Sequence, residues 1–265
     1  MSNLAEKIYY FPIMPTSSAI HLPDVLMQQY REDLAAAFHW FARLNWHEAH
    51  ANHFSVAVGD SGSEFLINPC GRHFSNIRAS ELLRLNADKP MDLDGGDAPD
   101  PTAWYIHSAL HRKKPQARCV MHLHSPGALA LSCLEDKGLP PIDNNTARFF
   151  DRVAVDDSFD GMSLSDEEAD RLVDCIGDKP VLLMGNHGVL VAGESIAQTF
   201  DDLYYFERAC QTYITVLSTG KMASVMSDEI AEKTAQQWRN YNGFAESHLR
   251  EIREILDREE PHYKD

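Results

Sequence analysis

Apolar residues change their spacing several times along this chain, from helical to strand periodicity and back, and no long linker interrupts the alternation. Residues 24–45 place apolar side chains three or four positions apart, whereas 53–58 and 64–69 are typical of two strands around the turn GDSGS. A helix that starts at Pro101 and a strand at 119–124 repeat the change of period. Because each element must bury its apolar face against another, this order predicts an α/β fold in which helices are layered on a central sheet.

The remaining elements are expected to continue the alternation. The sequence predicts a short helix at 79–86, a helix capped by Ser165, and two long final helices at 194–218 and 228–258. The acidic stretch DLDGGDAPDP at 92–101 is rich in glycine and proline and is expected to be a loop.

A length of 265 residues suits one large domain or two small ones, but the absence of a linker or an obvious boundary favours one domain over residues 1–265, with its core at about 24–220. The helix expected at 228–258 would then be available for a subunit interface.

Composition excludes two classes of partner. The formal net charge is −16, from 24 Lys and Arg against 40 Asp and Glu, so nucleic acid and anionic membranes would be repelled. No apolar run approaches the roughly 20 residues that span a bilayer. The N-terminus also lacks a signal pattern, and the five cysteines include no CxxC pair. We therefore expect a cytoplasmic protein that handles a small-molecule substrate and binds neither nucleic acid nor membrane.

The segment CVMHLHS at 119–125 contains two histidines one residue apart. On a strand, positions i and i+2 face the same side, so His122 and His124 project together while Leu123 turns into the core. A third candidate, His187, stands in MGNHGVL, where a glycine frees the turn after a buried strand. Each histidine alone fits a structural role as well, but three imidazoles with an open position are typical of a catalytic zinc or iron site.

Several motifs occur in a fixed order: HLHS, NHGV about 60 residues later, and also INPCG at 67–71, FFDRVAV at 149–155 and LYYFERAC at 203–210. From about Leu34 to Gln211 this arrangement resembles the class II aldolase/adducin family. The resemblance implies a single three-layer α/β/α domain with a central, mainly antiparallel sheet, and commonly a homotetramer with active sites between subunits. It also implies that His122, His124 and His187 bind a divalent metal, with Zn²⁺ expected and Fe²⁺ as the alternative.

The chain departs from the aldolases of that family at the acid/base position. Those enzymes carry a glutamate four residues before a helical histidine, and here the histidine is His107 while Ala103 holds the glutamate position. The phosphate-binding motifs are altered too, with His53 in NHFS and the turn NPCG at 68–71. These changes resemble the adducin-like branch. Some members of that branch have lost metal chemistry, whereas this chain keeps all three metal histidines.

Without the family glutamate, a nearby imidazole is the expected acid/base. His107 lies one helical turn after Ala103 on the same face and titrates near neutral pH, although a packing role between helix and sheet is equally open. We assign catalysis to His107 and His53. The residues expected to line the substrate end are Asn68, Cys70, Gly71 and His73.

Two other charged or titratable residues are expected near the surface. His111 stands beside Arg112 and Lys113, so we expect it to be exposed. For Arg148 a surface ion pair is the expected role, with the clamping of a carboxylate as the alternative.

Three functions remain open on these grounds. The first is a carbon–carbon lyase of the aldolase or decarboxylase type, acting on a small hydroxy- or oxo-acid with the metal as Lewis acid. The second is a non-haem iron oxygenase acting on an aromatic 2-oxo or 2-hydroxy acid, as described for a few relatives from aminocoumarin-type pathways. The third is a non-catalytic, adducin-like assembly module. Retention of all three metal ligands favours an enzyme, with the lyase ahead of the oxygenase.

Overall fold

The computed structural model describes residues 24–59, 61–91, 98–159 and 161–265. The expectations for the N-terminal segment and for most of the loop at 92–101 lie outside these ranges. Within them, no helix combines the length and the apolarity that crossing a membrane requires.

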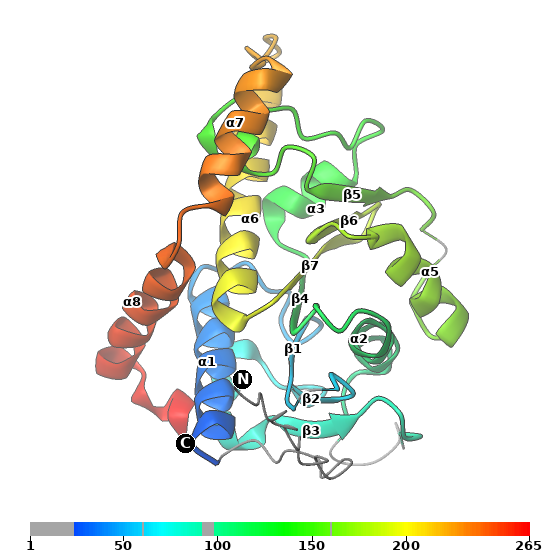
Figure 1. Cartoon of the computed structure of the whole chain (residues 1–265), viewed down its shortest axis with the longest axis vertical. Coiled ribbons are helices and arrows are strands. Elements are labelled where there is room, and N and C mark those ends of the chain that lie inside the picture. Colours follow the sequence, from blue (N-terminus) through cyan, green and yellow to red (C-terminus); the bar gives the residue numbers. More distant parts are fainter. Residues whose placement is uncertain (1–23, 60, 92–97, 160) are drawn as a thin grey trace, which may run out of the picture.

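A seven-stranded sheet forms the centre of the molecule (Figure 1). In spatial order its strands are β3 (Leu83–Asn86), β2 (Glu64–Ile67), β1 (His53–Ala57), β4 (Cys119–Leu123), β7 (Gly188–Gly193), β6 (Val181–Met184) and β5 (Val153–Asp156). Neighbouring strands run antiparallel, except for the parallel pair of β5 and β6. The expected α/β fold with a mainly antiparallel sheet is confirmed.

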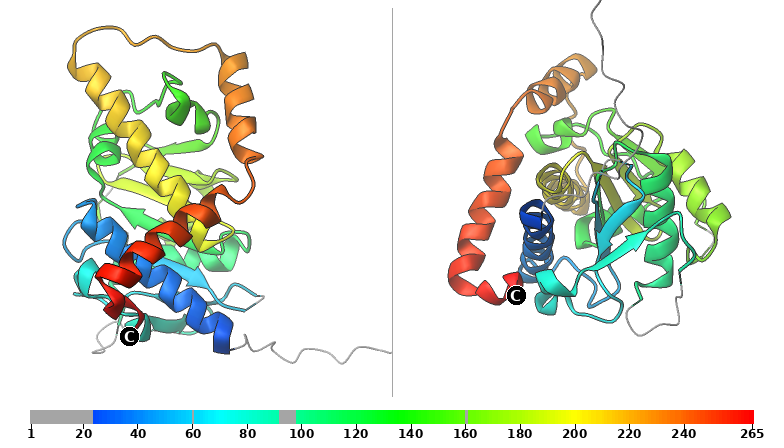
Figure 2. Two further views of the ribbon diagram at one scale, coloured as in Figure 1. Left: turned by 90° about the vertical axis from the view of Figure 1, so that its left-hand side faces the viewer. Right: turned by 60° about the horizontal axis from the view of Figure 1, so that its bottom comes forward.

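Helices cover both faces of the sheet, as the two further views in Figure 2 also show. One face carries α2 (Pro101–Lys113) and α5 (Asp166–Ile176), and the other carries α1 (Asp24–Arg43), α3 (Pro126–Ser132) and α6 (Ile196–Ser218). Outside these layers α7 (Asp228–Arg239) packs on α4 (Asn144–Arg148), and α8 (Phe244–Glu259) packs on α1 and α6.

Strand β4 shows why two separate cores form. Met121 and Leu123 pack with α1 and α6, whereas Val120 packs with α2 and α5. Because successive side chains of a strand face opposite sides, His122 must lie on the side of Val120 and α2. The alternation expected for Leu123 is confirmed, and it places His122 in the layer between the sheet and α2.

The prediction of a short helix at 79–86 is wrong for most of that segment. Only Ala79–Glu81 forms a turn of 3₁₀-helix, and Leu83–Asn86 is the edge strand β3. Leu83 and Leu85 pack on Phe65 of β2 while Arg84 faces outward to pair with Glu64, so the period is two. Four residues are too few to separate that period from a helical one, and the tertiary pairing with β2 decides the outcome.

The prediction of a single long helix at 228–258 is also wrong. Two helices, α7 and α8, are separated at residues 240–243, where Gly243 has φ +76° and precedes the first residue of α8. Glycine adopts this left-handed conformation at little cost, so the chain can change direction there. The sequence Asn-Tyr-Asn-Gly is a turn signal that the helical periodicity on either side concealed.

Candidate metal centre

The three histidines singled out by the sequence lie together where β4 ends and β7 begins. Their ring centroids are 4.8 Å apart in each of the three pairs. One nitrogen from each of His122, His124 and His187 falls within 4.8 Å of the others. Side chains arranged in this way can converge on one ion.

Hydrogen bonds fix the tautomer of two of these rings. Nδ1 of His122 lies 3.0 Å from the carbonyl oxygen of Val189, and Nδ1 of His124 contacts a carboxylate oxygen of Glu48. A carbonyl and an ionised carboxylate only accept, so each Nδ1 carries the hydrogen and each Nε2 keeps its lone pair. The two Nε2 atoms face each other at 2.9 Å.

This donor set fits a divalent cation. Two lone pairs at 2.9 Å repel each other unless a positive charge lies between or beside them. Metal-bound histidines usually donate their second N–H to a carbonyl or carboxylate, which is the arrangement seen at Val189 and Glu48. His122, His124 and His187 would hold such an ion with one open position, as in catalytic rather than structural sites.

The environment keeps His122 and His187 neutral. Burial lowers the pKa of His122 well below its ordinary value, and repulsion from the neighbouring rings adds to the effect. Burial and His124 lower the pKa of His187 to about 4. A neutral imidazole is the form that binds metal, so the site is ready for an ion at neutral pH.

The β6–β7 turn positions His187 through its backbone. His187 N donates to Met184 O, and Asn186 N donates to Ser132 O at the end of α3. At Gly188, φ is +154° and a Cβ atom would lie 2.5 Å from the carbonyl oxygen of Leu123. Only glycine therefore allows the turn to pack this closely against the end of β4.

Substitution of Glu48 tests the orientation of His124. We expect Glu48→Gln to weaken Zn²⁺ binding by about 10-fold to 100-fold, because an amide no longer favours the hydrogen on Nδ1 of His124. Competition with a chromogenic chelator would measure the affinity. The exposed Glu229 of α7 provides the matched control, Glu229→Gln. Equal affinities for the two variants would show that Glu48 does not orient the ligand.

A second group of histidines lies next to the metal centre, between the sheet and α2. His53 on β1 pairs in register with His122 on β4, and their ring centroids are 4.9 Å apart. Nδ1 of His53 lies 2.7 Å from Nε2 of His107, whose Nδ1 in turn contacts Ser55 Oγ. Ser55 Oγ also lies 2.7 Å from Nε2 of His111. The four side chains form a continuous row, each at most 3% exposed.

The expectation that His111 is exposed is therefore wrong. His111 is 1% exposed and stacks on Phe65 with a centroid distance of 4.9 Å. It stands four residues after His107, so both project from the same face of α2. Arg112 and Lys113, which suggested exposure, are themselves exposed.

Burial also makes the fold sensitive to acid. The pKa values of His53 and His111 are lowered to about 3, mainly by burial, so both are neutral in the folded protein. The unfolded chain binds protons on these groups near pH 6.5, so their contribution to stability is complete above that pH and is lost as the pH falls towards 3.

We expect the free energy of unfolding of the metal-free protein to decrease already between pH 6.5 and 5, above the range in which most carboxylates titrate. Urea denaturation at several pH values would measure this slope. His111→Gln should flatten it and His262→Gln, an exposed control, should not. A free energy that is constant from pH 6.5 to 5 would contradict the assignment.

Of the four residues expected at the substrate end, Asn68 is buried, whereas Cys70, Gly71 and His73 are exposed. Asn68 is buried and structural, because it accepts from Phe54 N and donates to Asn52 O. Cys70 and Gly71 form an exposed turn, and burial together with Asp100 raises the pKa of the Cys70 thiol. Exposed His73 pairs with His47, with 2.8 Å between their Nε2 atoms. Within the described residues, no hydrogen bond joins Asn68, Cys70, Gly71 or His73 to the three metal-site histidines.

Comparison with known proteins settles the family. The sequence model of the Class II Aldolase and Adducin N-terminal domain matches residues 32–214. The chain belongs to the class II aldolase/adducin family. An aldolase II superfamily protein from Pseudomonas syringae has the same fold, with a TM-score of 0.82 and 31% identity over 90% of this chain and 96% of that one.

Two Streptomyces relatives of this class II aldolase/adducin protein carry names that include an activity. Decarboxylase NovR of Streptomyces niveus is 26% identical over 223 residues, which are 81% of this chain and 82% of the relative. A protein of Streptomyces roseochromogenus subsp. oscitans is 27% identical over 81% of this chain and 80% of its own length. Its name is 4-hydroxy-3-prenylphenylpyruvate oxygenase/4-hydroxy-3-prenylbenzoate synthase.

At Ala103, where the resemblance leads us to expect the aldolase glutamate, this class II aldolase/adducin protein has a closed apolar contact. Ala103 is 1% exposed and packs in a cluster with Phe65, Ile67 and Trp104. A glutamate there would have to bury its carboxylate among these side chains. His107 and His111 follow one and two helical turns later on α2.

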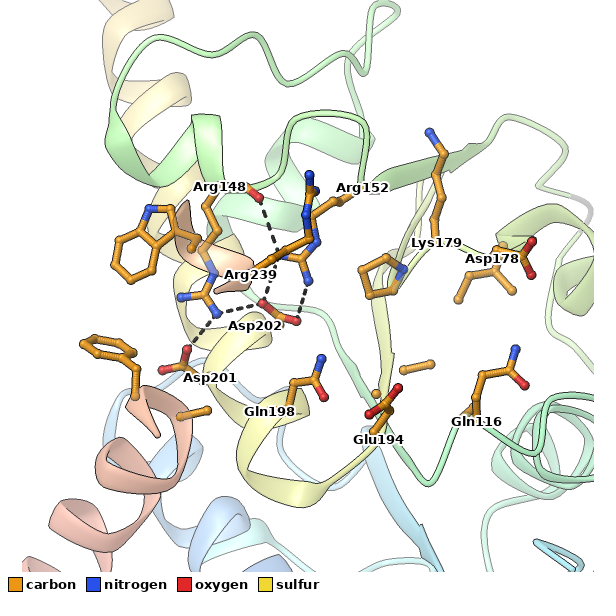
Figure 3. A pocket seen from close by; sticks show the side chains of 18 of the residues that line it. Gln116, Arg148, Arg152, Asp178, Lys179, Glu194, Gln198, Asp201, Asp202 and Arg239 are labelled. Atoms are coloured by element: carbon orange, nitrogen blue, oxygen red, sulfur yellow. Dashed lines mark hydrogen bonds and ion pairs between the residues drawn. The ribbon is translucent and has the colours of Figure 1, made fainter. Parts of the chain in front are cut away.

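A cavity of about 650 Å³ in this class II aldolase/adducin protein, drawn in Figure 3, is lined by none of the three metal-site histidines. It is bordered by Ala117 before β4, Pro180 before β6 and Gly193 at the end of β7. The histidines stand at the opposite ends of the same strands, roughly 15 Å away at 3.3 Å per residue.

Arg148, at the wall of this cavity, is not the surface residue that we expect from the sequence. It is 6% exposed, and its Nη2 lies 2.6 Å from Asp201 Oδ2 and 2.7 Å from Asp202 Oδ1 (Figure 3). Arg152 also pairs with Asp202, at 2.9 Å. The carboxylates that Arg148 binds belong to its own chain, on α6.

Three residues of the site were missed by sequence reasoning. Ser55 and His111 could have been found, because Ser55 is two residues from His53 on a strand and His111 is one helical turn from His107. Glu48 lies in the irregular segment HEAHAN before β1, and no periodicity predicts that its carboxylate meets His124.

Proposed function

We propose that this protein is a divalent-metal-dependent carbon–carbon lyase, of the aldolase or decarboxylase type, that acts on a small hydroxy- or oxo-acid. The observation that carries the proposal is the convergence of His122, His124 and His187, with Nε2 lone pairs fixed on two of the rings by Val189 and Glu48. A closed structural site would need a fourth protein ligand, and among the described residues the cluster contains three.

A divalent ion bound there would supply Lewis-acid chemistry, polarising an oxygen of the acid and stabilising negative charge on it. The protein's own contribution is acid/base chemistry at the adjoining row. His53 lies beside His122 and is the member of the row nearest the three ligands. Its Nε2 is the atom that would hold or release a proton, and His107 supports it from the helix side.

The remaining assignments follow the family. Zn²⁺ is the proposed ion and Fe²⁺ the alternative, since three neutral imidazoles suit both. The turn at Cys70 and Gly71, with His73, is proposed to face the substrate, and buried Asn68 supports that turn. We further propose one domain over the whole chain, a cytoplasmic location and a homotetramer.

One observation favours an oxygenase as the second candidate. Phe159 lies beside the metal centre, with its ring centroid 6.0 Å from that of His187, and it is 50% exposed. Met162 and Leu164 on the same loop are also exposed. An apolar wall suits an aromatic acid, and the relative named as a 4-hydroxy-3-prenylphenylpyruvate oxygenase carries such a substrate in its name.

Metal analysis and turnover with and without oxygen would separate the functions. Zn²⁺ reconstitution followed by anaerobic release of carbon dioxide, pyruvate or an aldehyde would support the lyase. Oxygen uptake that requires Fe²⁺ and an aromatic 2-oxo or 2-hydroxy acid would instead support the oxygenase. A protein that retains well under one ion per chain after reloading would exclude both enzymes and leave an adducin-like assembly module.

A further inference from the structure

The buried row His53–His107–Ser55–His111 has a property that none of its members has alone. Each link joins a ring nitrogen to a ring nitrogen or to the serine hydroxyl, and each neutral imidazole has one N–H and one lone pair. The position of the hydrogen in one link therefore fixes the hydrogen in the next.

Two hydrogen orders satisfy every link and also give the Ser55 hydroxyl hydrogen an acceptor. In the first order, His53 Nδ1–H donates to His107, His107 Nδ1–H donates to Ser55, and the Ser55 hydroxyl donates to His111 Nε2. All three rings then carry the hydrogen on Nδ1. In the second order every direction is reversed, and all three rings carry it on Nε2. A hydroxyl that accepted from both His107 and His111 would leave its own hydrogen without a partner in the described part of the chain.

The two ends of the row favour the first order. At the near end, a cation at the three ligands would favour a lone pair, not an N–H, on neighbouring His53 Nε2. At the far end, His111 Nδ1 is buried without a hydrogen bond within the described residues. Because Nε2 of His111 faces Ser55, Nδ1 is the nitrogen left to carry the hydrogen toward the backbone of Ala117, which raises the pKa of His111 as a nearby acceptor does.

We propose that Ser55 and His111 are positioning residues that act through His107 to hold His53 in the tautomer whose unprotonated Nε2 faces the metal centre. This rests on the proposed function, because a fixed lone pair at His53 is what acceptance of a substrate proton requires. The row compensates for the apolar contact at Ala103, since it supplies a base on β1, His53, whose orientation is supported by His107 of the same helix as Ala103.

The geometry of the row explains why four buried polar groups are tolerated between α2 and the sheet. Ser55 and His107 are 0% exposed, and an unpaired polar group at such a depth would cost about 1–3 kcal/mol. In the first order every nitrogen from His53 Nδ1 to His111 Nε2 has a partner. Burial keeps the rings neutral, with the pKa of His107 well below its ordinary value, so the order depends on tautomer and not on charge.

Nitrogen-15 NMR of histidine-labelled, Zn²⁺-loaded protein tests the inference without any substrate. Protonated and unprotonated ring nitrogens give well-separated shifts, and single His→Gln variants assign the rings. We expect His53, His107 and His111 all to carry the hydrogen on Nδ1. Rings that do not share one tautomer, or that share the Nε2–H form, would overturn the proposal.

Variants of Ser55 provide the matched comparison. Ser55→Ala removes the hydroxyl and should give mixed tautomers at His53 and His107, whereas Ser55→Thr should restore a single order. Ser132→Ala, which removes another buried hydroxyl outside the row, should leave the tautomers unchanged. If Ser55→Ala does not fold, His111→Gln is the second variant. Its amide can donate or accept, so it should also mix the tautomers, and unchanged shifts in either variant would contradict the role.

Turnover gives an independent measure once a substrate is found. Ser55→Ala should lower kcat by about 10-fold or more with little change in KM, because the base loses its orientation and not its binding contacts. Correct tautomers without lyase activity would reject the proposed function and leave the positioning role intact. Lyase activity with unordered tautomers would do the reverse.

Discussion

His187→Ala should lose stable metal binding, with affinity for Zn²⁺ reduced by more than about 100-fold. This loss is larger than the one expected when a residue that only hydrogen-bonds a metal ligand, such as Glu48, is replaced. The remaining pair, His122 and His124, comes from one strand end and can occupy only two positions of a tetrahedral ion. Inductively coupled plasma mass spectrometry after dialysis would measure the metal per chain.

His262→Ala is the matched control, because His262 is exposed on the final 3₁₀ turn, far from the site in sequence. Full metal content in His187→Ala would remove this residue from the centre and, with it, the basis of the proposed lyase. Circular dichroism should show that both variants remain folded, since His187 is partly exposed at a turn and outside the apolar core.

Arg148→Met should have the largest effect on stability, a loss of about 3–5 kcal/mol. Asp201 and Asp202 are 1% and 2% exposed, so removal of the guanidinium leaves two buried carboxylates. Arg152 still pairs with Asp202 and His248 still contacts Asp201, which places the expected loss near the lower end of the range. Urea denaturation at pH 7 would measure it.

Two further variants test whether the loss comes from the buried carboxylates left without Arg148 or from the packing of its side chain. Arg250→Met removes an exposed pair with Glu251 and should cost less than about 1 kcal/mol. Arg148→Met combined with Asp202→Leu removes one stranded carboxylate and should recover part of the loss. If Arg148→Met is no less stable than Arg250→Met, the buried pair does not stabilise the fold. Arg148 also stacks on Tyr205 and Trp238, so a loss that the double variant does not recover would point to that contact.

The sequence predicts the layered fold well because its signals are long and local. The 20-residue α1 and the 13-residue α2 begin where the periodicity and Pro101 place them, and the alternation through β4 puts Leu123 in the opposite core from His122. The same reasoning fails over four residues at β3, and it fails at Gly243, where strong helical patterns on both sides conceal a turn.

For the site, the sequence identifies histidines but not their partners. The pair at 122 and 124 follows from strand geometry, and His187 follows from the turn chemistry of Gly188. The carboxylate of Glu48, 76 positions before His124, could not be predicted in the same way, because contacts across that separation depend on how β1 and β4 pair. Arg148 gave the wrong expectation for the same reason, since its partners on α6 are more than 50 positions away.

Sequence alone determined the layered α/β class of the fold and the set of three candidate metal histidines, because periodicity and turn residues act between near neighbours. Only the tertiary structure decided which groups surround those histidines. Packing α2 on β1 buries His107 and His111 against His53 and Ser55, and the low polarity of that layer favours the hydrogen bonds that join the four side chains. The position of the hydrogens in that row is thus a property of the folded molecule.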